Sequence, residues 1–149
     1  MSLLLALALA AAPEPVFHCS FGAKQLTVTQ EGDALVYRYG TKDKAELRIV
    51  ADAASRRVFY NRRLYPRAED QTLRFVSGDY SYIVYAHWSA PSMGMTEEGS
   101  TPERYYGGLH VWRGETELSS RRCISGGDMR EWPIFKTLPQ DDENLTPEE

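Results

Sequence analysis

The stretch 71-QTLRFVSGDYSYIVYAHW-88 decides the fold of this chain of 149 residues. Residues 71–77 place Leu73 and Phe75 on one face, with the period of two that is typical of a β-strand. The Gly-Asp pair that follows is typical of a tight hairpin turn. Residues 80–88 are partly apolar on both faces, which favours a central position in a sheet. The stretch therefore predicts an antiparallel hairpin whose second strand lies in the middle of the sheet.

Similar alternating segments lie on both sides of this hairpin and are separated by turn residues. They are expected at residues 16–20, 25–30, 34–39, 45–50, 57–64, 105–113 and 116–123. No helical stripe of useful length follows residue 16 in the sequence. Because open sheet edges invite aggregation, such a sheet closes on itself or doubles over. We therefore expect an all-β fold, a small antiparallel β-barrel or sandwich of about eight strands closed by one disulfide.

Two stretches depart from this alternation. Residues 89–104 contain two prolines and two glycines, and a loop of this length is often functional or mobile. Residues 125–127 are expected to be flexible. Residues 128–135 are expected to add a strand or a short helix, with Trp132 packed on the body of the domain.

The N-terminus resembles a secretory leader. Residues 2–12 form a continuous apolar run, which is shorter than the about 20 residues of a membrane span and fits the apolar region of a signal peptide. Ala8 and Ala10 supply a cleavage site before Ala11. The leader lacks a basic residue, so an apolar helix of a cytosolic protein is the alternative. The expected organisation is a signal peptide at 1–10, a single β domain at 11–138 and an acidic disordered tail at 139–149.

The chain has two cysteines, Cys19 and Cys123, which bracket the predicted strands. They are interpreted as a disulfide that joins the first strand to the last strand of one closed sheet, in a periplasmic or secreted protein. Closing so long a loop stabilises the fold by about 4–5 kcal/mol in the chain-entropy model. Two free buried thiols are the alternative. A lipid anchor at Cys19 is rejected, because His18 stands where a small residue is required.

Composition and motifs limit the function classes. The net charge is −4, and much of it lies in the acidic tail, so the folded body is close to neutral. A nucleic-acid-binding domain would be strongly basic, and none is expected here. The sequence contains no nucleophile elbow, metalloprotease helix, phosphate-binding loop or dinucleotide fingerprint. We therefore expect a protein that is not an enzyme and binds no cofactor.

Three histidines, His18, His87 and His110, lie on expected strands. They would form a metal site only if those strands were neighbours. We expect satisfied strand residues instead, and no metal.

A group of arginines alternates with aromatic residues in the middle of the chain: Arg56, Arg57, Arg62, Arg63 and Arg67, with Phe59, Tyr60 and Tyr65. Guanidinium groups pair bidentately with carboxylate or phosphate, so this stretch could bind an anionic partner. The alternative interpretation, which we favour, is the solvated face of a strand.

Two predicted hairpin tips, within residues 76–82 and 111–118, each carry a glycine beside a hydrogen-bonding or cationic side chain. Rigid strands that hold such a tip can present a small polar probe to the cleft of a partner. Ordinary turn chemistry is the alternative, because Gly-Asp and Gly-Glu turns are common. If the tips act together, Ser77 and Arg113 should lie at adjacent, exposed tips at one end of the fold.

The order of these features resembles the periplasmic inhibitors of c-type lysozyme. Phe17-His18-Cys19 is similar to the first element of that family and Cys123 to its closing cysteine. Ser77-Gly78 is similar to the first loop motif, although Tyr80 and Tyr82 fall on either side of the expected tyrosine position. Trp112-Arg113-Gly114-Glu115 is similar to the second loop motif, with Arg113 in place of the usual lysine. The resemblance implies partner-binding residues Ser77, Gly78, Tyr80, Arg113 and Gly114.

The sequence thus predicts an exported binding protein that inhibits, or protects against, a lysozyme-like cell-wall hydrolase by inserting hairpin loops into its cleft. Two alternatives stay open. One is a non-catalytic interaction or structural module of the cell envelope. The other is a carrier that holds a small apolar ligand among Tyr and Phe side chains. No transmembrane segment is expected in the mature chain.

Overall fold

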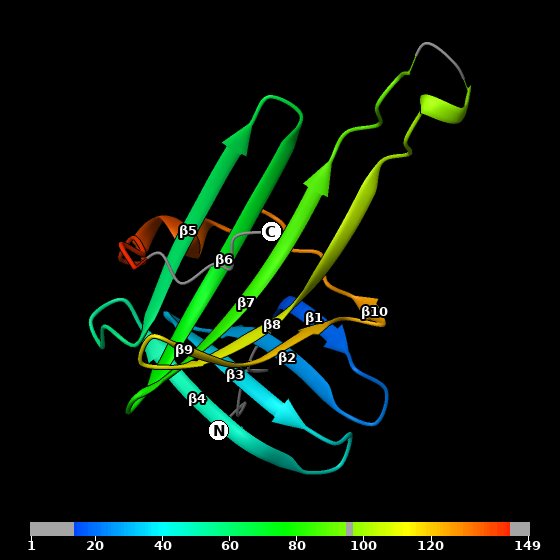
Figure 1. Cartoon of the computed structure of the whole chain (residues 1–149). Coiled ribbons are helices and arrows are strands. Elements are labelled where there is room, and N and C mark those ends of the chain that lie inside the picture. Colours follow the sequence, from blue (N-terminus) through cyan, green and yellow to red (C-terminus); the bar gives the residue numbers. More distant parts are fainter. Residues whose placement is uncertain (1–13, 95–96, 144–149) are drawn as a thin grey trace, which may run out of the picture.

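The computed structural model describes residues 14–94 and 97–143, so the expected signal peptide lies outside the described residues. The chain forms two antiparallel five-stranded sheets (Figure 1). The first sheet, in spatial order, consists of β10 (Ser125–Gly126), β1 (Glu14–Ser20), β2 (Gln25–Glu31), β3 (Ala34–Gly40) and β4 (Ala45–Asp52). The second consists of β5 (Val58–Tyr65), β6 (Ala68–Ser77), β7 (Tyr80–Ser89), β8 (Arg104–Arg113) and β9 (Thr116–Arg122).

The predicted all-β fold is confirmed, and the arrangement is a sandwich rather than a closed barrel. β6 and β7 form the expected hairpin, in which Ser77 pairs with Tyr80. β7 is the central strand of its sheet, between β6 and β8. Both faces of β7 carry apolar residues. Side chains of the flanking β6 and β8 shield these residues from water more fully than they would be shielded in an edge strand.

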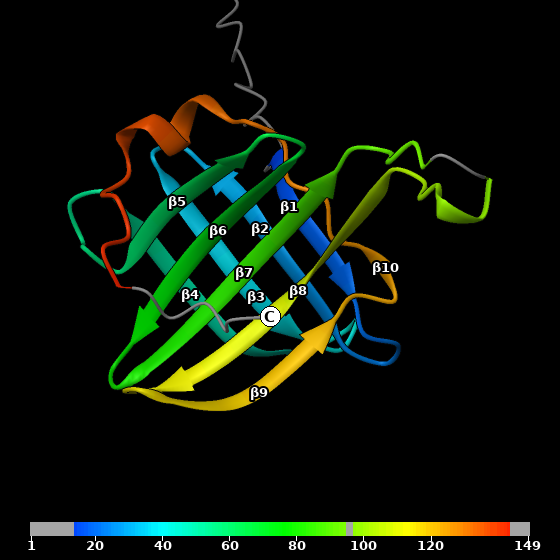
Figure 2. The same cartoon turned by 45° about the horizontal axis from the view of Figure 1, so that its top comes forward.

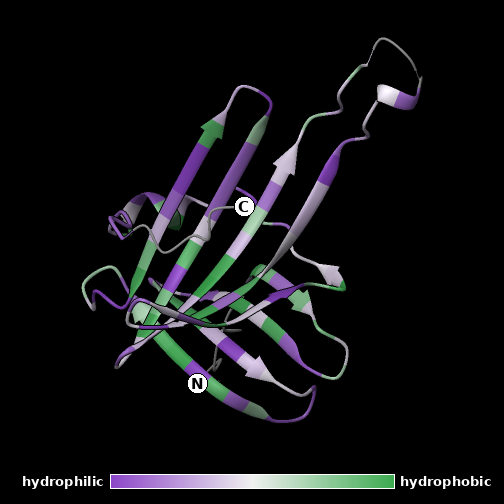
Figure 3. Ribbon diagram, in the orientation of Figure 1, coloured by the Kyte–Doolittle hydropathy of each residue, from purple (hydrophilic) through white to green (hydrophobic). Residues whose placement is uncertain are grey.

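The core lies between the two sheets. Apolar and polar residues alternate along the strands, as Figure 3 shows, and the apolar side chains of each sheet face the other. Tyr37 of the first sheet packs against Phe75 and Tyr82 of the second, with ring centroids 5.3 and 5.5 Å apart. Complete burial of a side chain such as Phe75 stabilises the fold by about 1.5–3 kcal/mol. The interior at this level is therefore filled by protein side chains.

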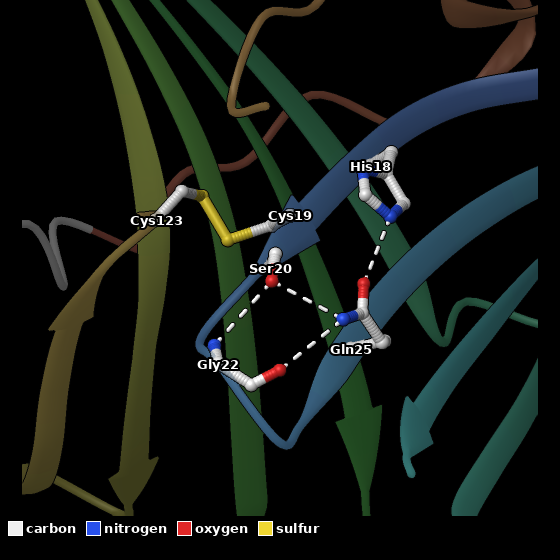
Figure 4. Close-up of a disulfide and its surroundings, with 6 residues drawn as sticks. All are labelled: His18, Cys19, Ser20, Gly22, Gln25 and Cys123. Carbon is white, nitrogen blue, oxygen red and sulfur yellow. Dashed lines mark hydrogen bonds between the residues drawn. A yellow bond between two sulfur atoms is a disulfide. The ribbon is translucent and has the colours of Figure 1, made fainter. Parts of the chain in front are cut away.

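The Cys19–Cys123 disulfide is present, with the two Cα atoms 5.3 Å apart (Figure 4). Cys19 lies in β1 and Cys123 directly follows β9, so the bond joins the two sheets rather than two strands of one closed sheet. This corrects the predicted role of the bridge. Beside it, the N–H of Ile124 donates to the carbonyl oxygen of Ser20 at 2.7 Å.

Residues 125–127 are paired rather than free, in contrast to the prediction. β10 pairs with β1 through Cys19 and Gly126. The N–H of Gly127 donates to the carbonyl oxygen of His18 at 2.8 Å. These bonds form because the disulfide brings the chain after β9 to the edge of the first sheet.

Residues 89–104 are also more regular than expected, because β7 and β8 pair as far as Ser89 and Arg104. Beyond them the ribbon continues as an arm, which we define as residues 90–94 and 97–103. Ser92 and Thr101 exchange two backbone hydrogen bonds of 2.8 and 2.9 Å, and a 3-10 turn follows at Glu97–Gly99. Figures 1 and 2 show the arm projecting away from both sheets.

The chain after β10 closes one side of the sandwich. A 3-10 helix, η2 (Pro133–Thr137), follows Trp132, which packs against the core as expected. Phe135 stacks on Tyr60 with ring centroids 4.6 Å apart. This contact holds the C-terminal segment beside β5.

The first part of the predicted disordered tail lies along β5. The N–H of Tyr60 donates to the carbonyl oxygen of Pro139, and the N–H of Asp141 donates to the carbonyl oxygen of Tyr60, both at 3.0 Å. Gln140 thereby forms a parallel bridge with Tyr60. Residues 139–143 are held in place, because these backbone bonds and an ion pair of Asp141 offset the cost of ordering the chain. The remaining part of the expected tail, residues 144–149, lies outside the described residues.

Candidate functional site

The two hairpin tips lie side by side at one end of the second sheet (Figure 2). The β6–β7 tip comprises residues 77–80 and the β8–β9 tip comprises residues 113–116. Tyr80 pairs directly with Arg113, so the two side chains are on the same face of the sheet. The N–H of Gly114 donates to the carbonyl oxygen of Asp79 at 3.0 Å. The tips are therefore joined into one platform.

Gly78 and Gly114 have left-handed backbone conformations, with φ of 58° and 56°. Glycine adopts this region without steric cost, which is the reason for its use in tight hairpin turns. A Cβ atom added at either position would meet no atom within 4 Å. The surface around both turns is thus open to a partner.

A row of three aromatic rings, Tyr37, Tyr82 and Tyr80, runs from the core to the platform. Tyr82 packs on the buried Tyr37, and Tyr80 stacks on Tyr82 with ring centroids 6.3 Å apart. The Arg113 guanidinium carbon lies 5.6 Å from the centroid of the Tyr80 ring, a contact worth about 0.5–1 kcal/mol at an exposed site. Burial raises the pKa of Tyr82 above its ordinary value, and the neighbouring Tyr80 raises it further. The exposed Arg113 side chain therefore lies against a ring that is connected to the core through Tyr82 and Tyr37.

The charge of the platform is mixed. Arg113, Asp79 and Glu115 are all exposed. Within the part of the chain that the structure describes, Arg113 forms no ion pair. Ser77 is half-buried next to Tyr80. The platform therefore presents a cationic group and a hydroxyl group together, with two carboxylates beside them.

The structure keeps the three histidines apart. His18 contacts Gln25 at 3.0 Å, His110 contacts Glu117 at 2.9 Å, and His87 contacts Asp70. Among residues 14–94 and 97–143, no group of three or more metal-ligating side chains could hold an ion. The histidines are strand residues, each with a partner of its own.

The arginines in the middle of the chain also do not form a common surface. Arg57 donates to the carbonyl oxygen of Val50 in β4, and Arg67 of the β5–β6 turn donates to that of Pro91 in the arm. Arg62 pairs with Glu69 at 2.7 Å. The arrangement favours structural contacts over an anion-binding site.

One pocket, of about 300 Å³, lies between β5 and the C-terminal segment. Tyr60, Phe135 and Lys136 are among the residues that line it. It is not the space between the sheets in which a carrier would hold its ligand, since Tyr37, Phe75 and Tyr82 pack on one another there.

One group of side chains was not predicted from the sequence. Trp88, Glu103 and Tyr105 meet at the end of the second sheet opposite the tips, through hydrogen bonds to the Glu103 carboxylate. Residues 89–104 were interpreted as an irregular loop, so its two ends were not expected to pair. Aromatic residues at both ends of that segment were the available signal.

Comparison of the chain with protein-family models, with curated proteins and with solved structures finds no match. Within the described residues no helix has the length and apolar character needed to cross a membrane. The fold and the site define a two-sheet, disulfide-linked β-sandwich that presents a platform of two joined hairpin tips.

Proposed function

We propose that this protein is an exported binding protein that inserts its two hairpin tips into the cleft of a lysozyme-like cell-wall hydrolase and inhibits it. One observation carries the proposal: Gly114 and Asp79 hydrogen-bond at 3.0 Å, which joins the tips into one platform. A rigid, preorganised probe loses little conformational entropy on binding. The protein would act by occupying the cleft rather than by catalysis.

The chemistry of the platform suits such a cleft. A glycoside hydrolase of this class carries two carboxyl groups at its active site. Arg113 would pair with one of them, and the Ser77 hydroxyl group would hydrogen-bond to the other. Truncation of one partner of such a desolvated charge pair typically costs about 2–5 kcal/mol.

The disulfide supports the location that this function requires. Disulfides persist in oxidising compartments such as the periplasm and the extracellular space, and cell-wall hydrolases act there. The Cys19–Cys123 bond connects the second sheet, which holds the platform, to the first sheet. It is compatible with an extracytoplasmic protein.

A non-inhibitory interaction module of the envelope is the second candidate. The observation that favours it is the exposed apolar character at the other end of the second sheet, where Leu64 and Tyr105 are 68% and 65% exposed. A protein with that surface could join envelope components without entering an active site.

The proposal is tested by incubating the mature protein with c-type and other lysozymes and measuring residual hydrolysis of peptidoglycan. We expect stoichiometric inhibition of at least one hydrolase, and a loss of roughly tenfold or more in affinity for Arg113→Ala. The matched control is Arg48→Ala, at an exposed arginine on β4 of the other sheet.

Two outcomes would contradict the proposal. If no hydrolase binds, the inhibitor function is wrong and the envelope module becomes the leading candidate. If a hydrolase is inhibited equally by the wild type, Arg113→Ala and Arg48→Ala, inhibition occurs without the platform.

A further inference from the structure

A row of four side chains crosses the second sheet at the end opposite the tips. Leu64 pairs with Glu69, Glu69 pairs with Trp88, and Trp88 pairs with Tyr105. Side chains that are directly opposite in neighbouring strands point to the same face. We call this row, together with Glu103, the shelf.

The shelf lies on the same face of the sheet as the core but outside it. Trp88 is four residues beyond the fully buried Val84 in the same strand, so both side chains face the same way. Leu64 and Tyr105 are nevertheless 68% and 65% exposed. Figure 1 shows the reason, since β5 to β8 continue past the end of the first sheet. The shelf is an uncovered extension of the core face.

Hydrogen bonds order the aromatic part of the shelf. The indole N–H of Trp88 and the hydroxyl group of Tyr105 both donate to Glu103 Oε1, at 2.6 and 2.7 Å. These two bonds lower the pKa of Glu103, because they stabilise its ionised form. The result is a fixed carboxylate between two partly exposed aromatic rings.

The surroundings of the row are acidic. Glu69 and Glu131 share the guanidinium of Arg62, at 2.7 and 3.7 Å. Together with Glu103 there are three carboxylates and one guanidinium, and the exposed Arg67 of the β5–β6 turn lies at the same end of the sheet, so the net charge is −1. Aromatic faces beside carboxylates attract organic cations, through the ring quadrupole and through the charge.

The length of the row indicates the size of the ligand. Four neighbouring strands span about 14 Å, at about 4.8 Å between strands. An extended peptide covers that distance with about four residues. A single ammonium headgroup would occupy only the Trp88 end and leave Leu64 uncovered.

We propose that the shelf is a docking surface for a basic, extended segment of a protein partner. An Arg or Lys side chain of that segment lies over Trp88 and Tyr105 with its charge at Glu103, and an apolar neighbour covers Leu64. The aliphatic stems of these cationic side chains pack well on apolar surface, which suits an exposed Leu. The site is remote from the tips and does not depend on the proposed inhibition.

The test is a titration of the mature protein with a short amidated peptide that alternates Arg and Leu, followed by tryptophan fluorescence. Because Trp112 and Trp132 also emit, the Trp88→Phe variant identifies the signal of Trp88. We expect saturable binding of this peptide and none of the peptide that alternates Glu and Leu. Glu103→Gln should weaken binding by about fivefold or more.

Two matched variants distinguish binding at the shelf from nonspecific attraction between charges and from binding at the tips. Glu98→Gln removes the same charge from the same arm outside the shelf, and Arg113→Ala changes only the platform. Both should bind the basic peptide as the wild type does. Tyr105→Phe, which keeps the ring and loses the hydroxyl group, should weaken binding if the ordered carboxylate is required.

The proposal is overturned if the two peptides bind equally, if Glu103→Gln binds the basic peptide unchanged, or if Glu98→Gln weakens it as much as Glu103→Gln does. It is also overturned if the mature protein self-associates through Trp88, measured by sedimentation of wild type and Trp88→Phe, because a second copy would then be the occupant.

Discussion

Arg74 and Asp141 are 67 residues apart in sequence and form an ion pair in which each side chain is only 6% exposed. Arg74 Nε lies 3.1 and 3.0 Å from the two carboxylate oxygens of Asp141. The guanidinium also lies over the ring of Phe59, 4.4 Å from its centroid. This pair attaches the C-terminal segment to the second sheet.

Loss of one partner of this pair should strongly destabilise the protein. Asp141→Asn leaves the buried guanidinium with only the exposed Glu143, 3.6 Å away, as a counter-charge. The expected loss in the free energy of unfolding is therefore up to about 3 kcal/mol, the lower end of the range for an uncompensated buried charge. Urea unfolding followed by circular dichroism measures it. The control is Asp142→Asn at the neighbouring exposed position. The double variant Arg74→Met, Asp141→Leu replaces the ion pair by an apolar pair and should recover most of the stability that Asp141→Asn loses. A double variant less stable than Asp141→Asn would contradict the explanation by an unpaired buried charge.

Removal of the disulfide should reduce stability without exposing thiol chemistry. The Cys19→Ala, Cys123→Ala variant loses a cross-link across 104 residues, and the expected cost is about 4–5 kcal/mol. Chemical denaturation measures the difference. The reduced wild type should unfold at nearly the same denaturant concentration as the double variant. A difference below about 1 kcal/mol would show that the backbone bonds beside the bridge hold the sheets without it.

Stability should fall at alkaline pH because of buried tyrosines. Burial raises the pKa of Tyr60 to about 12 and raises that of Tyr37 further. A raised pKa means that the folded state favours the neutral phenol. The contribution is therefore complete below the ordinary tyrosine pKa of about 10 and is lost as the pH rises through the folded value.

The variant Tyr60→Phe isolates one of these groups. It loses the hydrogen bond from the Tyr60 hydroxyl group to Gln71, which is 2.8 Å long, at a cost of about 1 kcal/mol at neutral pH. Its stability should then decline less steeply above the ordinary tyrosine pKa than that of the wild type. Unfolding measured as a function of pH, together with tyrosinate absorbance, checks both effects. Ionisation of every tyrosine at its ordinary pKa in the folded protein would contradict them.

A bulkier residue at a tip should block insertion and leave the fold intact. Asn tolerates the left-handed conformation of Gly114, and an added Cβ meets open space. Gly114→Asn should therefore unfold at a temperature close to that of the wild type and bind the partner hydrolase more weakly. Gly32→Asn, at a β2–β3 turn of the other sheet with φ of 62°, is the matched control. Equal inhibition by both variants would remove Gly114 from the interface.

Removal of a carboxylate beside Arg113 should strengthen binding to an acidic cleft. Glu115 is exposed in the same turn as Arg113, so it repels a partner carboxylate in that cleft. Glu115→Gln should increase the association rate, most clearly at low ionic strength. Surface plasmon resonance at two salt concentrations measures it. A slower association would mean that the cleft presents positive charge to this tip.

The strands of this protein follow closely from the sequence, because alternation is a local property. Leu73 and Phe75 identified the core face of β6, and both are fully buried. The Gly78 and Gly114 turns were recognisable because few other residues tolerate their conformation. The two tips lie together, as the pairing of Tyr80 with Arg113 shows. Arg113 is exposed as expected, but Ser77 is half-buried rather than exposed. That these residues bind a partner stays a prediction.

The tertiary structure alone decided how the strands are grouped. The alternation of apolar and polar residues shows which side chains of a strand share a face, but it does not show which strands are neighbours. The alternation was equally consistent with a barrel and a sandwich, and the two separate sheets determined that Cys19 and Cys123 join different sheets. The contacts of Arg74 with Asp141, and of Trp88 with Glu103, connect residues distant in sequence. Such contacts depend on the packing of the whole chain, whereas strands and turns are favoured by a few adjacent residues.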